Sequence, residues 1–277
     1  MLGDIANLLV VLLVLVSGFI WWQAVWKLKT NQPLLPFRER KPPRWNLWVV
    51  LIAVCWIVSP FIIQFTAPPA DEKDKPSSEI VQTADEKGKP PLETVKTFCK
   101  LSTLVLLVLF TLLIQAHRSS MSEFGFDLRH WKQQLADGGL GFLASGLPTV
   151  AALLLITPLR KPGTEHTYFK ILDAHPSLET IAWIGLAVIV LAPLIEELLY
   201  RVILQGFLQT RTSPAWAIGI SSVTFASVHG FPNSLALLPL SVILGYVYYR
   251  RHSYLSVVVL HAVFNSWNLI IALLKPA

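Results

Sequence analysis

The chain has 277 residues, of which 53% are hydrophobic and 14% are charged, and its mean hydropathy is +0.55. These values lie outside the range of soluble globular domains and indicate an integral membrane protein. The net charge of +6 does not indicate a nucleic-acid partner, because the basic residues are scattered in short loops between apolar stretches. With only Cys55 and Cys99, neither a disulfide framework nor a paired-cysteine metal site is expected.

The first predicted span covers about 5–26, because a membrane-crossing helix needs about 20 mainly apolar residues. It ends in a belt of tryptophans, and its apolar run is too long for a cleaved signal peptide. The following loop is strongly basic, so we place it in the cytoplasm and the N-terminus outside. Its basic residues are Lys27, Lys29, Arg38, Arg40, Lys41 and Arg44, against the single acid Glu39. The second predicted span covers about 45–66.

The segment 67–97 changes in composition to Pro, Lys, Asp and Glu, and we expect it to be a disordered extramembrane loop. A metal-binding acidic loop is the alternative, which the interleaved lysines disfavour. A third span is predicted over 98–116. The basic and aromatic residues of 117–137 predict an interfacial helix at the cytoplasmic face. Residues 1–137 are thus expected to form an N-terminal membrane region.

Residues 138–277 are expected to form a second region with five further spans. These cover about 138–159, 178–209, 212–229, 234–249 and 254–274. The first of them contains Ala144-Ser-Gly146, small residues that let helices approach closely. Ser145 lacks the flanking pattern of an intramembrane serine nucleophile, and Phe126 before Asp127 departs from the Gly-x-Gly-Asp of intramembrane aspartyl proteases. The sequence therefore predicts an all-α polytopic membrane protein with about eight transmembrane helices.

Two adjacent glutamates and an arginine interrupt the apolar run of the fifth predicted span. An ionisable group in lipid costs about 2.5–3.5 kcal/mol on insertion scales and is usually retained for a function. Glu197 and Arg201 share a helix face, so we expect an ion pair with a structural role. Glu196 points elsewhere and is left for acid–base chemistry. Pro193 is expected to free the carbonyl of Ile189 and to kink the helix.

The last three predicted helices contain histidines but no acidic residue. His252 follows two arginines in a loop and is expected to be solvated. His229 ends the sixth predicted helix, and His261 shares a face with Asn265 in the eighth. A lone membrane histidine often only donates a hydrogen bond between helices. Two histidines together with a buried glutamate pair favour a functional site.

The side chains of Glu196, His229, His261 and Asn265 supply what peptide hydrolysis by an activated water requires. A carboxylate and an imidazole can hold and deprotonate a water molecule. Two donors on one helix face can bind the developing oxyanion, a contribution of about 3–4 kcal/mol per donor. No serine or cysteine in the sequence has an equally good setting for a nucleophile.

Three motifs, in this order, resemble the signatures of the CPBP family, which comprises CAAX proteases and bacteriocin-processing enzymes. They are Glu196-Glu-x-x-x-Arg201, Phe225-x-x-x-His229 and His261-x-x-x-Asn265, and the resemblance covers about 138–274. It implies an eight-helix intramembrane glutamic endopeptidase with its active site in the bundle core and no metal or other cofactor. The residues matching Glu196 and His229 would activate water, and those matching His261 and Asn265 would form the oxyanion hole. Glu197, Arg201 and Phe225 would support the site.

The resemblance also implies a multi-pass protein of a bacterial inner membrane that acts on membrane-associated protein or peptide substrates, with no nucleic-acid partner. It leaves open whether the role is processing or bacteriocin immunity. One alternative is a metal-dependent membrane protease with Glu196, His229 and His261 as ligands, although the two-histidine spacing of His-Glu-x-x-His zinc sites is missing. Another is a transporter that uses the buried carboxylates, although no inverted repeat is visible.

Overall fold

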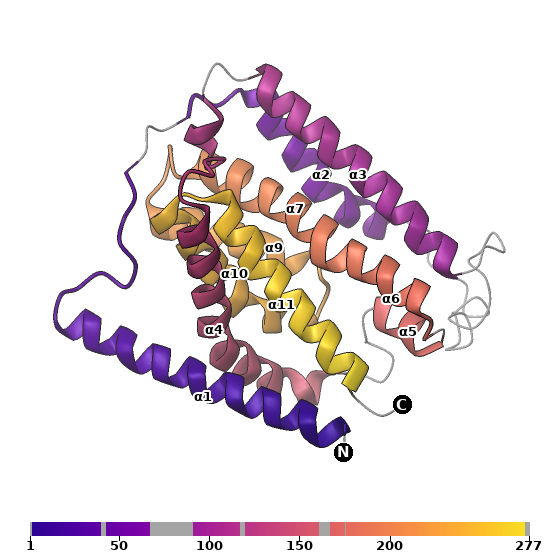
Figure 1. Cartoon of the computed structure of the whole chain (residues 1–277). Helices are drawn as coiled ribbons and strands as arrows, with labels where there is room; N and C mark the ends of the chain where they lie inside the picture. Colours follow the sequence, from indigo (N-terminus) through magenta and orange to yellow (C-terminus); the bar gives the residue numbers. More distant parts are fainter. Residues whose placement is uncertain are drawn as a thin grey trace.

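The structure is a computed structural model. It describes residues 2–39, 43–66, 91–116, 120–160, 167–174 and 176–274. Every regular element in these ranges is helical (Figure 1), so the predicted all-α class is confirmed. The predicted loop over 67–97 lies outside the described residues up to 90. Its last part, 91–97, is instead the start of a helix, so the loop prediction was wrong there.

The helices follow one another along the chain. They are α1 (Leu2–Lys29), α2 (Leu47–Thr66), α3 (Pro91–Ala116), α4 (Trp131–Ile156), α5 (Thr167–Ala174), α6 (Leu178–Gly185), α7 (Ala192–Glu196), α8 (Gly206–Leu208), α9 (Pro214–Ser227), α10 (Asn233–Arg251) and α11 (Tyr254–Leu274). Two π-helical segments, η5 (Leu186–Leu191) and η6 (Glu197–Gln205), join α6, α7 and α8 into one continuous helix.

Five helices of the described part are long and apolar enough to cross a membrane, which makes the chain an integral multi-pass membrane protein. They span Leu2–Lys29, Leu92–Gln115, Trp131–Leu159, Leu178–Leu208 and Tyr254–Leu274, and Leu47–Val58 is a shorter apolar helix. The predicted count of about eight spans is not confirmed. With 14 residues, α9 is about 21 Å long at 1.5 Å per residue, which is less than the hydrocarbon thickness of a bilayer. It is therefore too short to cross the membrane on its own.

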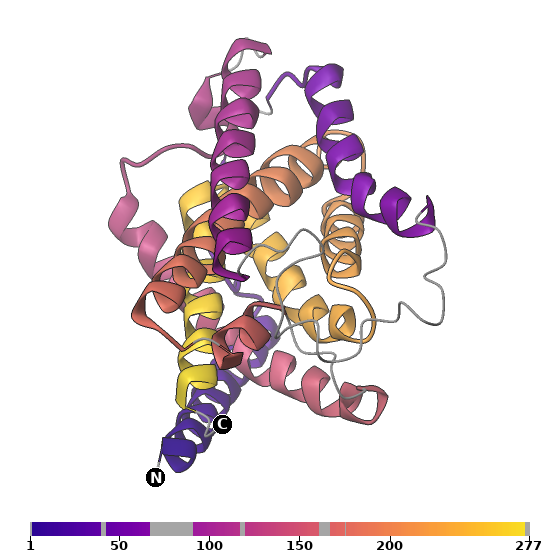
Figure 2. The same cartoon turned by 90° about the vertical axis from the view of Figure 1, so that its right-hand side faces the viewer.

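In Figure 1, α4 lies beside α1, α10 and α11. It packs against α10 and α11 on one side and against α1 on the other, whereas α2 and α3 contact the continuous helix 178–208 (Figures 1 and 2). The start of α1 and the end of α11 lie at the same end of the bundle. The predicted division into 1–137 and 138–277 stays a prediction. Helix α1 of the first region packs directly on α4, most of which belongs to the second region, so the two regions are in contact.

Small residues of α4 allow this close packing, as predicted. A Cβ atom on Gly138 would lie 2.7 Å from the carbonyl oxygen of Ser256, and one on Gly146 would lie 2.6 Å from the side chain of Leu13. Ser145 is fully buried and its hydroxyl donates to the carbonyl of Phe142, which fits a packing role.

A proline in α4 also creates the attachment point for α1. Pro148 has no N–H, so it leaves the carbonyl of Ala144 without its usual helical donor. The hydroxyl of Ser17 and the indole N–H of Trp21, both on α1, donate to that carbonyl at 3.0 and 2.9 Å. In return, Ser17 accepts a hydrogen bond from the backbone N–H of Leu147. These bonds fix the position of α1 along α4.

The structure differs from the sequence predictions at three connections. In place of an interfacial helix over 117–137, the described residues form a short 3₁₀ turn, Met121–Phe124, and the first turns of α4. The left-handed conformation of Gly125 (φ 92°) ends the turn and prevents a continuous helix. The predicted polar connection between α4 and α6 contains α5. His252 is not solvated but 6% exposed, and its Nε2 donates to the carbonyl of Glu123 at 2.8 Å.

Candidate active site

The continuous helix 178–208 is irregular close to the two glutamates. In η5, backbone N–H groups donate to carbonyls five residues back instead of four. With this spacing, the missing N–H of Pro193 leaves the carbonyl of Val188 without a donor, rather than the carbonyl of Ile189 that an α-helix would predict. The side-chain amide of Asn265 donates to the carbonyl of Val188 at 2.7 Å. Asn265 therefore supports the irregular segment from α11.

A second contact from α11 supports the same helix. The hydroxyl of Tyr254 donates to the carbonyl of Leu194 at 2.6 Å, two residues before Glu196. Sequence reasoning missed Tyr254, because a single tyrosine at the start of an apolar helix is also typical of a membrane-interface residue. Together with Asn265, it fixes the backbone that presents both glutamates.

Replacing Tyr254 with Phe removes this hydrogen bond and little else. We expect the free energy of unfolding to fall by about 1 kcal/mol, the usual net value of one intramolecular hydrogen bond. Thermal unfolding of the purified protein in detergent measures the change. Tyr249→Phe is the matched control, because the ring of Tyr249 packs against Phe37 in another part of the bundle. Equal unfolding temperatures for the two variants would contradict a supporting role for Tyr254.

The predicted ion pair between Glu197 and Arg201 is confirmed. Their Oε2 and Nε atoms are 3.2 Å apart, and both side chains are completely buried. Arg201 also donates through Nη2 to the hydroxyl of Ser241 at 3.0 Å, and its guanidinium lies 4.9 Å from the ring centroid of Phe225. Each buried charge thus has an opposite charge or a polar partner, which burial of an ion requires.

Glu197 also holds one of the predicted site histidines. Its Oε1 accepts a hydrogen bond from Nδ1 of His261 at 2.7 Å. A carboxylate can only accept, so Nδ1 carries the proton and the other ring nitrogen, Nε2, is left for chemistry. That nitrogen lies 3.8 Å from Oε2 of Glu196. His261 is therefore placed between the two glutamates, an arrangement that the sequence did not predict.

Glu196 has the least engaged carboxylate of this group. Its side chain is 27% exposed, and its buried Oε2 atom has no hydrogen-bond partner among the described residues. The 3.8 Å separation from His261 is too long for a direct hydrogen bond. One water molecule with contacts of about 2.8 Å to each group fits such a distance. Glu196 is thus available for chemistry, whereas Glu197 accepts a hydrogen bond from His261 and forms an ion pair with Arg201.

His229 and His261 lie on either side of one aromatic ring. The ring centroid of Phe225 is 5.0 Å from that of His229 and 5.7 Å from that of His261. Nδ1 of His229 donates to the carbonyl of Phe225 at 2.9 Å. Within the described part of the chain, no ring nitrogen of His229 lies within 4.0 Å of a carboxylate oxygen of Glu196. Their joint role in water activation therefore stays a prediction, as does an oxyanion role for Asn265.

Within the described part of the chain, no group of three or more His, Cys, Asp or Glu side chains is arranged to hold a metal ion. Glu196, His229 and His261 do not form such a group, although they were the ligands of the metal alternative. That alternative therefore gains no support from the arrangement of the side chains.

Comparison with known proteins places these side chains in one family segment. Residues 178–267 match the family model described as "Type II CAAX prenyl endopeptidase Rce1-like", and every predicted site residue lies within this range. The matched segment is of the CPBP family. The CPBP segment covers the continuous helix, α9, α10 and most of α11, and it contains the contacts of Glu196, Glu197, His229, His261 and Asn265 described above.

The chain is also similar to a bacterial relative. It is 40% identical over 82 residues to the UPF0177 protein YaiF of Lactococcus lactis subsp. lactis (strain IL1403). The similar region covers 29% of this chain and 36% of that protein, so the chain spans about a third of the length of this relative. No solved structure matches the chain significantly.

Proposed function

We propose that this chain is an intramembrane endopeptidase, which hydrolyses a peptide bond of a membrane-associated protein or peptide with a water activated by Glu196, without a metal ion. The observation that carries the proposal is the carboxylate of Glu196, whose Oε2 has no hydrogen-bond partner in the described structure, beside a histidine fixed by a fully buried ion pair. The Rce1-like family match of residues 178–267 supports the same reaction class.

In the proposed reaction, the substrate water lies between Oε2 of Glu196 and Nε2 of His261. Glu196 takes one proton from the water, whose oxygen forms a bond with the carbonyl carbon of the peptide. The resulting tetrahedral oxyanion collapses, and the carbon–nitrogen bond breaks. Glu196 passes the proton to the departing nitrogen, and the second proton of the water stays on the new acid, so that the products are a carboxylic acid and an amine. No atom or electron from a cofactor is needed.

The charges of the site suit this chemistry. Glu197 carries one negative charge and Arg201 one positive charge, so a protonated His261 balances the remaining charge of Glu196. A protonated imidazole oriented by Glu197 is a strong donor to the oxyanion, a role that contributes about 3–4 kcal/mol per donor in other hydrolases. His229 donates through Nδ1 to Phe225, so its neutral form has its lone pair on Nε2 and can accept a hydrogen bond from water.

The position of the site favours a substrate segment within the membrane. Glu196 lies near the middle of the 31-residue span Leu178–Leu208, and His229 follows the end of α9. The reacting groups are therefore expected at the depth of the hydrocarbon region. A peptide bond must reach this depth to be cleaved, which selects substrates that are apolar or attached to the membrane.

The direct test is cleavage of a quenched fluorescent library of apolar peptides by the full chain in detergent. We expect cleavage that strong chelators do not reduce, because no step requires a metal. Loss of cleavage in chelator and its recovery with zinc would support the metal alternative and contradict our proposal. His229→Ala is expected to reduce the rate by about 10²-fold or more, as loss of an acid–base or water-holding group does. Unchanged turnover in that variant would remove His229 from the reaction.

A further inference from the structure

A second polar site lies away from the candidate active site, at the ends of three helices. A cavity of about 230 Å³ opens where α4 begins, where α10 ends and before α11 starts. Its lining includes Arg38, His130, Gln134, Asp137, Arg251 and Ser253, none of which belongs to the site around Glu196. The volume accommodates several water molecules at about 30 Å³ each, or one small polar group.

One side of this cavity is suited to an anion. Arg38 is bonded through Nη2 to Asp127 at 2.9 Å, and Arg251 through Nε to Asp137 at 2.6 Å. Each guanidinium has five N–H donors, so further donors are left on both. The first turn of α4 also begins here, with His130 at a position whose side chain makes no capping hydrogen bond. Backbone N–H groups at such a helix start attract negative charge.

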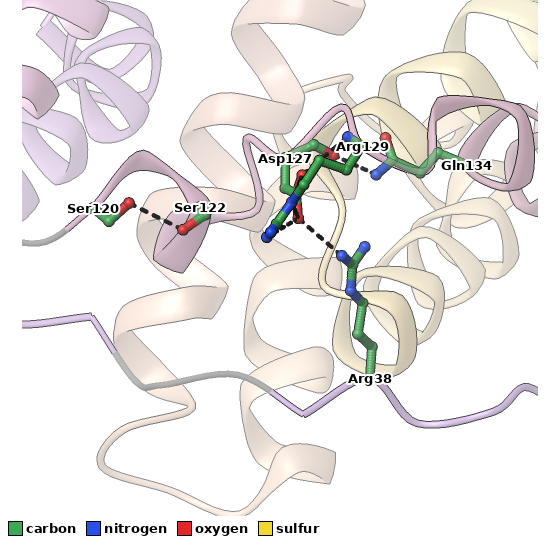
Figure 3. A network of polar contacts seen from close by, with 6 residues as sticks. All are labelled: Arg38, Ser120, Ser122, Asp127, Arg129 and Gln134. Atoms are coloured by element: carbon green, nitrogen blue, oxygen red, sulfur yellow. Dashed lines mark hydrogen bonds and ion pairs between the residues drawn. The ribbon is translucent and has the colours of Figure 1, made fainter.

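Asp127 fixes Arg38 in its place beside the cavity (Figure 3). Arg129 donates to the carboxylate of Asp127 through Nε at 3.0 Å and through Nη2 at 2.9 Å. These hydrogen bonds hold the pKa of Asp127 well below its usual range, so the carboxylate keeps its charge. Arg38 is therefore held by a permanent negative charge and cannot easily turn away from the cavity.

Gln134, which also lines the cavity, requires a ligand that donates a hydrogen bond. This side chain is 3% exposed, and its Nε2 donates to the backbone carbonyl of Asp127 (Figure 3). Its Oε1 has no hydrogen-bond partner in the described part of the chain. A buried acceptor without a donor is costly, so a ligand with N–H groups would stabilise this position. The carboxylate of Asp137, one turn further along α4, adds negative charge on the same side.

The cavity also lies at the level of lipid head groups. It is bounded by the start of α4, the end of α10 and the residues before α11, and this face carries Arg129 and Lys132 around the start of α4 and Arg250 in the last turn of α10. Basic pockets between helix ends at this face are suited to lipid phosphates. Leu128, Trp131 and Leu135 are exposed apolar side chains beside and along the start of α4, where an acyl chain can pack.

We propose that this cavity binds the phosphoethanolamine head group of an aminophospholipid. Arg38, Arg251 and the start of α4 hold the phosphate, and Gln134 and Asp137 accept hydrogen bonds from the primary ammonium group. A purely anionic ligand leaves the acceptor of Gln134 unsatisfied, whereas a ligand without a phosphate leaves the arginine donors unused. The lipid anchors the ends of α4, α10 and α11 to each other.

Native mass spectrometry of the full chain in detergent tests the proposal with three lipids that have identical acyl chains. We expect phosphatidylethanolamine to bind about tenfold more tightly than phosphatidylcholine, whose ammonium has no N–H, and than phosphatidylglycerol, which has no ammonium. Equal binding of the three lipids would overturn the proposal. Free phosphoethanolamine is expected to bind far more weakly than the lipid. Equally tight binding would overturn the assignment to a membrane lipid.

Two variants test whether the lipid head group binds at Gln134 and Arg38. Gln134→Met removes the acceptor at similar size and is expected to abolish the preference for phosphatidylethanolamine over phosphatidylcholine. Gln32→Met, an exposed glutamine outside the cavity lining, is the matched control and keeps the preference. Arg38→Gln changes a partly exposed residue. It is expected to weaken the binding of both lipids by about tenfold and to leave the ratio of their two affinities unchanged. An unchanged preference in Gln134→Met, or unchanged affinities in Arg38→Gln, would overturn the proposed site.

Discussion

Replacing Glu196 with Gln is expected to reduce peptide cleavage by about 10³-fold or more, because an amide cannot take the proton of the attacking water. The fold should tolerate the change. The side chain is partly exposed, and its Oε2 has no hydrogen-bond partner within the described structure that the substitution would remove. The measurement is the initial rate on the peptide library, together with the thermal unfolding temperature of the same preparation.

The matched control for this variant is Glu179→Gln, at the start of the same membrane helix. Glu179 is largely exposed and pairs with Lys96 at 2.9 Å, far along the helix from the site. We expect it to retain the wild-type cleavage rate. Retained turnover in Glu196→Gln would remove this residue from the mechanism. A Glu196→Gln protein that unfolds at a much lower temperature would show a structural role instead.

Replacing Glu197 with Gln is expected to have the largest effect on stability, about 3–5 kcal/mol, because it leaves the positive charge of Arg201 completely buried without its counter-ion. The readout is the free energy of unfolding in detergent. Activity is less informative here, because the same substitution changes the partner of His261. A Glu197→Gln protein as stable as wild type would contradict the structural assignment.

A double variant separates the loss of the ion pair from the loss of packing. Arg201→Met alone leaves Glu197 buried without its guanidinium partner, and it should destabilise by a similar amount. In Glu197→Gln with Arg201→Met, no unpaired charge remains on this helix face. We therefore expect the double variant to be clearly more stable than the sum of the single changes predicts. Simple additivity would show that the two side chains do not stabilise each other.

The features that could be predicted from the sequence are those that depend on neighbours along one helix. The spacing of Glu197 and Arg201 determines a shared face in any regular helix, and the small residues around Gly146 pack closely wherever α4 lies. The contact between Glu197 and His261 was different, because it depends on how two distant helices meet. His252 was likewise predicted only as a loop residue, because its contact with the turn before α4 depends on how distant segments pack.

The exact place of the freed carbonyl could not be predicted either. It depends on whether the backbone before Pro193 repeats with four or with five residues, and a proline is compatible with both. The polar cavity at the start of α4 was missed for a related reason. Gln134 and Asp137 lie in a segment that the sequence assigned to an interfacial helix, so their burial against α10 was not foreseen.

The ion pair between Glu197 and Arg201 has a consequence for biosynthesis, because both residues belong to the same helix. It can form as soon as this helix leaves the ribosome, before α9, α10 and α11 have emerged from it. The segment then enters the insertion machinery with one negative charge already neutralised, which lowers the cost of its transfer into lipid. Ser241 and His261 join later, when their own helices are delivered. The chain thus supplies its own counter-ion during insertion.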